Sequence, residues 1–149
     1  MTIRLMCSVL AMAVVLSGQQ AAQAGRVQRL AALEYVLAQM MAQDLDGTQA
    51  KARRAAFYLQ WTLSTADQRM AGLIVDQCGR EYVSLMAEAR RIVGPRGEAS
   101  AIPAADQTRL ARLKEAHDEL LLRFGDRLSK ELSANGFGAI TRYLVPPPQ

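Results

Sequence analysis

Histidine and cysteine, which often carry catalysis or bind metals, are scarce in this 149-residue sequence: His117 is the one histidine, and Cys7 and Cys78 are the two cysteines. A zinc site at His117 would need carboxylates to complete its ligands. The sequence has no C-x-x-C-H, H-E-x-x-H, G-x-S-x-G or glycine-rich phosphate loop, and Lys114 stands where a di-iron Glu-x-x-His motif needs glutamate. We predict no catalytic residue, cofactor or metal site, with a metal-site protein using His117 as an alternative.

His117 has two interpretations. It lies one helical turn from Leu113 and Leu121, which indicates a histidine at the boundary of the core, bonded to a carbonyl or a carboxylate. The functional alternative is a pH-sensitive latch, because imidazole side chains ordinarily titrate near a pH of about 6.5. In that hypothesis, protonation in a mildly acidic compartment loosens the helix pair around His117.

The carboxylates alternate with basic residues at helical spacing. The predicted i,i+4 pairs are Glu119 with Arg123, Asp126 with Lys130, and Arg127 with Glu131. Such pairs are typical of a solvated helix face, whereas a catalytic acid needs an apolar pocket that raises its pKa. The carboxylates therefore indicate surface structure.

An aromatic cluster is the remaining candidate site. Phe57, Tyr58 and Trp61 fall within five residues, and Phe57 and Trp61 share one helical face while Tyr58 points elsewhere. They either pack in the core or serve as contact aromatics in an apolar groove for a client segment. The methionines suit the same two roles, because a flexible thioether side chain adapts to many partners. They are Met40, Met41, Met70 and Met86.

The sequence has 18 lysines and arginines against 14 acidic residues, a net charge of +4. The basic residues form two clusters, at Lys51, Arg53 and Arg54 and at Arg90, Arg91 and Arg96. Acidic residues interrupt them, so they do not form the continuous stripe typical of nucleic-acid binding. We predict no nucleic-acid partner and leave open a weak contact with an anionic membrane surface.

The first residues indicate export. A basic start at Arg4 precedes an apolar run from Leu5 to Leu16, and Ala22-Gln23-Ala24 supplies an A-x-A cleavage pattern. The run is twelve residues long, whereas a membrane-spanning helix needs about 20. We predict a signal peptide at residues 1–24, cleaved between Ala24 and Gly25, and a periplasmic or secreted protein; an uncleaved anchoring segment is the alternative.

Cleavage would leave Cys78 as the one cysteine of the mature chain. It falls on the same helical face as Ile74 and Tyr82, which indicates a buried small side chain. The alternative is a reactive thiol that forms an intermolecular disulfide in a homodimer.

Composition and periodicity predict helices throughout. The chain is 50% hydrophobic with 5 prolines and 10 glycines, and apolar residues recur three or four apart without the alternation of a strand. The apolar stripes include Val27, Leu73 and Val93. They predict four main helices, over residues 27–45, 48–62, 65–93 and about 104–134, with Thr48 as the cap of the second. A break at Asn135-Gly136 is followed by a short helix over 137–144. Residues 94–103 form a loop, and residues 145–149 a flexible proline-rich tail.

The sharpest local signal is Leu63-Ser64-Thr65-Ala66-Asp67. Ser64 can cap the amides of the following turn while Asp67 faces back toward it. With two long helices joined by short connections, we predict one all-α domain over residues 25–144. It is an antiparallel helical bundle or elongated helical hairpin with four main helices and a short C-terminal helix.

The sequence resembles a group of uncharacterised exported all-helical bacterial proteins. The shared elements are the Gly47 break, Arg53-Arg54, Phe57-Tyr58, Leu-Ser-x-x-Asp, Cys78, and a last helix with Asp118-Glu119-Leu120 and Arg127-Leu128. A more distant likeness is to the Spy/CpxP family of periplasmic chaperones, whose two L-T-x-x-Q helix starts correspond to Leu63–Asp67 and Leu132–Gly136. Both places depart from that pattern, with serine for threonine and Asp67 or Gly136 for glutamine.

We therefore predict an exported, non-catalytic helical protein that acts through protein contacts, with a chaperone-like role as one form of this function. Its partners would be protein clients or envelope components, and homodimerisation stays open. The alternatives are an envelope-structural module, an anionic-surface-binding module, or the metal-site protein using His117.

Overall fold

The computed structural model describes residues 3–41, 46–94 and 102–144, and the side chains of residues 22–41, 46–94 and 102–142 among them. These residues form five helices and no strand: α1 (Ile3–Met41), α2 (Gly47–Gln60), α3 (Thr65–Val93), α4 (Ala104–Glu131) and α5 (Ala134–Leu144). The prediction of an all-α fold with four main helices and a short C-terminal one is confirmed. The centre of the predicted loop, with Arg96, and the predicted tail lie outside the described residues.

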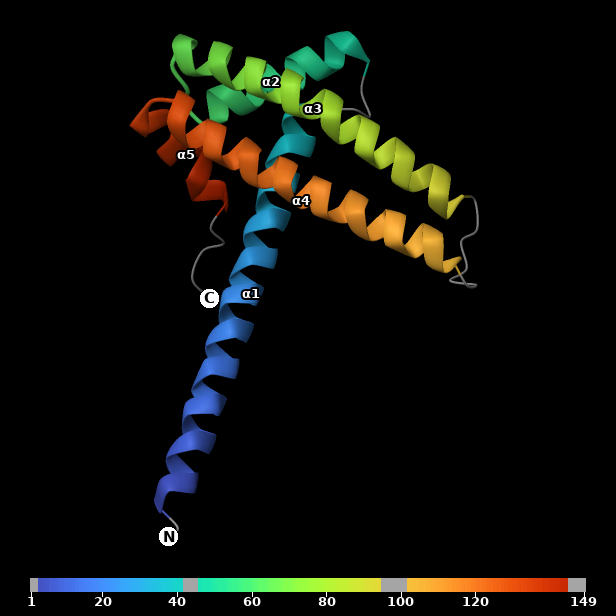
Figure 1. Ribbon diagram of the computed structural model, residues 1–149. Coiled ribbons are helices and arrows are strands. Elements are labelled where there is room, and N and C mark those ends of the chain that lie inside the picture. The colour runs from blue at the N-terminus through green and yellow to red at the C-terminus, as the bar shows by residue number, and fades with distance from the viewer. Residues whose placement is uncertain (1–2, 42–45, 95–101, 145–149) are drawn as a thin grey trace.

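Helices α3 and α4 form a long antiparallel hairpin and contact one another more extensively than any other helix pair in the described part of the chain (Figure 1). At about 1.5 Å per residue, the 29 residues of α3 span roughly 44 Å. The apolar stripes of the two helices meet along one seam. Its fully buried members include Ile74 and Val75 from α3 and Leu120, Phe124 and Leu128 from α4.

Helix α1 crosses this hairpin and closes the core. Its last turns bury Leu33, Leu37 and Met40, while the N-terminal half of α1 projects away from the other helices (Figure 1). The crossing is close because both hairpin helices carry a glycine there. A Cβ atom at Gly125 would lie 2.9 Å from Leu33 Cδ2, and one at Gly79 would lie 3.1 Å from Met41 Sδ.

Not every residue of the predicted stripes is buried. Val27, Leu73 and Val93 are 63%, 55% and 41% exposed, which corrects their assignment to buried faces. Val27 precedes Leu30, the first buried residue among the described side chains of α1, and Val93 ends α3. Periodicity shows which side of a helix is apolar, but it does not show how far a partner helix covers that side.

The N-cap of α2 lies two residues before the predicted one. Asp46, rather than Thr48, is the N-cap: its Oδ1 accepts hydrogen bonds from the Thr48 and Gln49 amides at 2.9 and 2.8 Å. Aspartate and threonine are both good caps, so sequence alone does not separate them here.

The end of α2 is a Schellman turn. The Leu63 amide donates to the Tyr58 carbonyl and the Thr62 amide donates to the Leu59 carbonyl, both at 3.0 Å. Thr62 has a φ of 52°, the left-handed conformation that glycine usually supplies at this position.

The predicted start of α3 is confirmed. The Ser64 Oγ accepts the Asp67 amide at 3.1 Å and donates to the Asp67 Oδ2 at 2.8 Å. The predicted break at Asn135-Gly136 is wrong, because α5 begins before it and Ser133 Oγ accepts the Gly136 amide at 3.0 Å. Ser133 therefore caps the start of α5, as Ser64 caps the start of α3.

Helix α1 runs without a break through the predicted cleavage point at Ala24 and Gly25. Every residue from 22 to 29 is exposed. Within the described part of the chain, no helix has the length and hydropathy needed to span a membrane.

Candidate functional site

Two of the three predicted contact aromatics lie in the core. Tyr58 and Trp61 are 8% and 4% exposed, and Phe57 is half-buried with its ring centroid 5.3 Å from that of Trp61. Burial raises the pKa of Tyr58. Phe57 and Trp61 contact one another, as their shared helical face predicts, and the burial of Tyr58 and Trp61 favours the interpretation of these aromatics as core residues that pack α2 onto the other helices.

His117 lies where α1, α3 and α4 meet. Glu34 Oε1 accepts a hydrogen bond from the Tyr82 hydroxyl at 2.9 Å, and the same oxygen lies 3.3 Å from His117 Nε2. The other ring nitrogen, Nδ1, lies 3.4 Å from an Asp118 carboxylate oxygen. The His117 side chain is 18% exposed, so its predicted place at the core boundary is confirmed.

Carboxylate oxygens lie beside both ring nitrogens of His117: that of Glu34, on α1, is near Nε2, and that of Asp118, on α4, is near Nδ1. The pH-sensitive latch stays a prediction. Lys114, 2.7 Å from Asp118, holds the pKa of that carboxyl below its usual range. Burial, with the Glu34 hydrogen bond, raises the pKa of Tyr82 to about 12, so the phenol remains a donor at neutral pH.

This cluster offers no metal site by its geometry. Among the described residues, no group of three or more histidine, cysteine, aspartate or glutamate side chains is arranged to hold a metal ion. The cluster joins three helices through one shared carboxylate, that of Glu34, and its role in this structure is to fix the crossing of α1 over the hairpin.

Cys78 is buried and forms no disulfide. Burial raises the pKa of its thiol, which lowers the fraction of reactive thiolate at neutral pH. This favours the interpretation as a small core side chain over that of an exposed coupling thiol.

The ion pairs partly match the prediction. Asp126 pairs with Lys130 and Arg127 with Glu131, as expected. Arg123 instead bonds Glu81 of α3 at 2.7 Å, because the neighbouring helix offers a carboxylate that sequence spacing does not reveal. Correspondingly, the predicted pair with Glu119 is wrong.

Arg54, from the first basic cluster, connects three helices. Its Nε donates to the Met40 carbonyl at 3.0 Å, and its Nη1 lies 2.9 Å from Asp76 Oδ1. It thereby closes the last turn of α1 with a hydrogen bond and ties α2 to α3.

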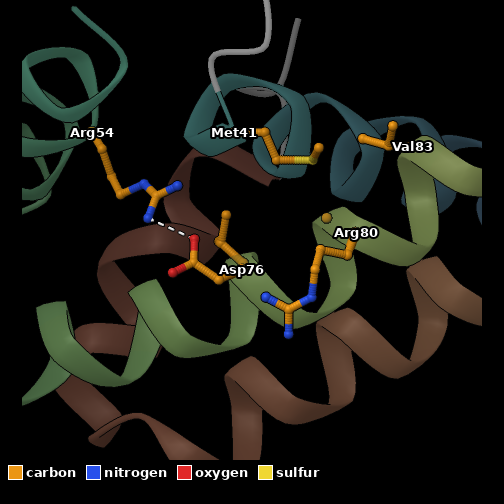
Figure 2. Close-up of a pocket in the computed structure, with 7 residues that line it drawn as sticks. Met41, Arg54, Asp76, Arg80 and Val83 are labelled. Carbon is orange, nitrogen blue, oxygen red and sulfur yellow. Dashed lines mark hydrogen bonds and ion pairs between the residues drawn. The ribbon is translucent and has the colours of Figure 1, made fainter. Parts of the chain in front are cut away.

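Beside Arg54 lies a groove between the end of α1, α2 and α3, here called the α1–α3 groove (Figure 2). Its volume is about 390 Å³, and it is open to solvent. Seven residues line it: Met41, Arg54, Val75, Asp76, Gly79, Arg80 and Val83.

The groove has an apolar floor because of two local features. Gly79 presents no side chain, so Met41 lies directly over the α3 backbone. Val83 lies one turn further along α3 and is 46% exposed. Apolar surface is thus left open next to a flexible thioether side chain.

A second groove, of about 570 Å³, lies between α1 and α4 next to the His117 cluster. Its lining is rich in charged groups, including Arg26, Glu34, Lys114 and Asp118. One further lining residue, Gln23, belongs to the predicted signal peptide, so cleavage would remove part of this groove.

The sequence interpretation named Met41 as an adaptable methionine but missed Gly79 and Val83. The available signals were a glycine inside a strongly helical segment, which usually marks a close approach, and a valine off the main apolar stripe of residues 65–93. Neither signal says which helix lies opposite.

Comparisons with protein-family models, curated proteins and solved structures each found no match.

Proposed function

We propose that this chain is an exported, non-catalytic protein that holds apolar segments of other proteins in the α1–α3 groove, which is a chaperone-like function. One observation carries the proposal. Met41, Val75 and Val83 line an open groove, whereas most other large apolar side chains of the described residues face a packed core.

The chemistry of the groove suits varied clients. Methionine has three rotatable side-chain bonds and a polarizable sulfur, so Met41 can repack against different apolar side chains. The groove is shallow and open rather than enclosed, which favours a short extended or helical segment over a small ligand.

The position along α1 at which side chains become buried supports export. Residues 22–29 are exposed and Leu30 is the first buried residue among the described α1 side chains, so cleavage after Ala24 would remove no described core contact. Intact-mass measurement of the chain produced with its own N-terminus in a bacterial host tests this. Loss of residues 1–24 is expected, and recovery of the full-length mass in the cell envelope would refute cleavage.

The function is tested by suppression of aggregation of a chemically unfolded client protein, followed by light scattering. The wild-type chain should suppress aggregation at a few-fold molar excess, and Val83→Asp should lose most of this effect because it places a charge on the apolar floor. Val93→Asp is the matched control, since Val93 is a similarly exposed valine of α3 that does not line the groove.

Circular dichroism melting curves should show both variants folded, because both valines are exposed. Equal loss of suppression in the two variants, or no suppression by the wild-type chain, would refute the proposed function.

A further inference from the structure

The α1–α3 groove carries a positive charge that is not neutralised. Arg54, at the α2 side, is paired with Asp76 at 2.9 Å. Arg80 also lines the groove and is exposed, and no hydrogen bond or ion pair joins it to any residue that the structure describes (Figure 2). The charge left available to a partner is therefore that of Arg80.

Arg80 and the apolar floor are close neighbours on one helix. Val83 follows Arg80 by three residues, a spacing that places side chains next to one another on a helix surface. Because the arginine side chain is long and flexible, a segment that rests an apolar side chain against Val83 and Met41 has its adjacent residue within reach of Arg80. A carboxylate suits that place best, because the planar fork of arginine can donate two parallel hydrogen bonds to it.

Resting on the proposed function, we infer that the groove prefers apolar segments in which an aspartate or glutamate stands beside the apolar residues. The apolar floor provides general affinity, and Arg80 selects among clients. Because the pair forms at an exposed rim, its contribution is modest and falls as salt is added.

The test uses three fluorescently labelled peptides that share leucine and valine in a glycine-serine background and differ at one position, which is Asp, Asn or Lys. Binding to the full chain is followed by anisotropy. The Asp peptide should bind about three- to fivefold more tightly than its isosteric Asn counterpart at low salt, with the difference shrinking in high salt. The Lys peptide should bind weakest.

Charge reversal makes the test specific. Arg80→Glu should invert the order so that the Lys peptide binds more tightly than the Asp peptide. Arg112→Glu is the matched control, because Arg112 is an exposed arginine of α4 outside the groove lining, and it should keep the wild-type order.

The outcomes separate the two proposals. If none of the peptides binds, the proposed function itself fails. If all three bind the wild-type chain equally, or if Arg112→Glu inverts the order as Arg80→Glu does, the selection by Arg80 is refuted while the groove remains a binding site.

Discussion

Asp67 is the one buried charged side chain among the described residues, at 5% exposure. Its carboxylate accepts hydrogen bonds from the Ser133 amide at 2.8 Å, from the Ser133 hydroxyl at 2.7 Å and from the Ser64 hydroxyl at 2.8 Å. Gly136 leaves the space for it, since a Cβ there would lie 2.7 Å from the carboxyl carbon. One carboxylate thus joins the starts of α3 and α5.

Replacing Asp67 with asparagine should destabilise the fold by about 2–4 kcal/mol, because an amide NH₂ would replace an acceptor oxygen and charge-assisted bonds would be lost. Urea unfolding at pH 7 measures this. Asp126→Asn, at an exposed surface pair, is the control and should leave the unfolding free energy nearly unchanged. Similar effects in both variants would contradict the role given to Asp67.

The stability should also depend on pH through Asp67. The hydrogen bond from the Ser133 amide, first among several causes, lowers the pKa of Asp67 in the folded chain. The stabilisation is therefore complete above the ordinary carboxyl pKa of about 4 and is lost as the pH falls through the lower folded value. The difference in unfolding free energy between wild type and Asp67→Asn should shrink as the pH falls below about 4; a constant difference would contradict this role of Asp67.

Thr62 holds a strained backbone at the end of α2. A β-branched residue at φ 52° costs the folded state roughly 1–2 kcal/mol of backbone strain. Glycine removes this strain but gives the unfolded chain more conformational entropy, which is the smaller effect. Thr62→Gly should therefore stabilise the fold by about 0.5–1 kcal/mol. Thr108→Gly, in the first half of α4, should destabilise the fold by a few tenths of a kcal/mol, about 0.3, because glycine is the poorer helix former. Thermal melting of both variants distinguishes them, and a lower melting temperature for Thr62→Gly would refute the strain.

At the scale of the elements, the crossing of α1 over the hairpin depends on small side chains. Gly125 meets Leu33, which is 2% exposed and has little room to move. Gly125→Ala should therefore destabilise the fold by about 1–2 kcal/mol even though alanine favours helices. In α5, no atom lies within 4 Å of a Cβ at Gly138, so Gly138→Ala should stabilise the fold by about 0.5–1 kcal/mol.

Chemical denaturation of the two glycine variants provides the measurement. Opposite signs are expected, and stabilisation by Gly125→Ala would show that α1 does not pack tightly against α4.

The elements themselves were largely predictable from sequence. Ser64 and Asp67 place the start of α3 because a capping serine followed by an acid satisfies backbone amides locally. Gly94 ends α3 with a φ of 63°. Periodicity and breaker residues misplaced the start of α5, because Asn135-Gly136 is a common breaker, although the likeness of Leu132–Gly136 to a helix start pointed to the right place. The glycine is required by Asp67, a residue 69 positions away.

At the scale of the whole molecule, the α3–α4 hairpin, α2, α5 and the last turns of α1 form one packed body. The N-terminal part of α1 projects from this body (Figure 1). A chain consisting of residues 25–149 should therefore unfold within about 0.5 kcal/mol of the full chain, because residues 22–29 bury no side chain. Parallel urea titrations measure this. A loss of several kcal/mol would show that the projecting part supports the core.

The site was less predictable than the fold. The aromatic cluster has the strongest composition signal, yet Trp61 and Tyr58 are buried because α2 docks on the other helices. The groove instead depends on how α1 packs across α3, with Met41 over Gly79 and Val83 left exposed. Such coverage is a tertiary property that one-dimensional periodicity does not contain.

The most direct test of the α1–α3 groove is a methyl NMR titration of the full chain with a short leucine- and valine-containing peptide. The Met41, Val75 and Val83 methyl signals should shift, and the Val93 signals should stay unchanged. Unchanged signals from all three groove residues, or shifts centred on Val93, would contradict binding in this groove.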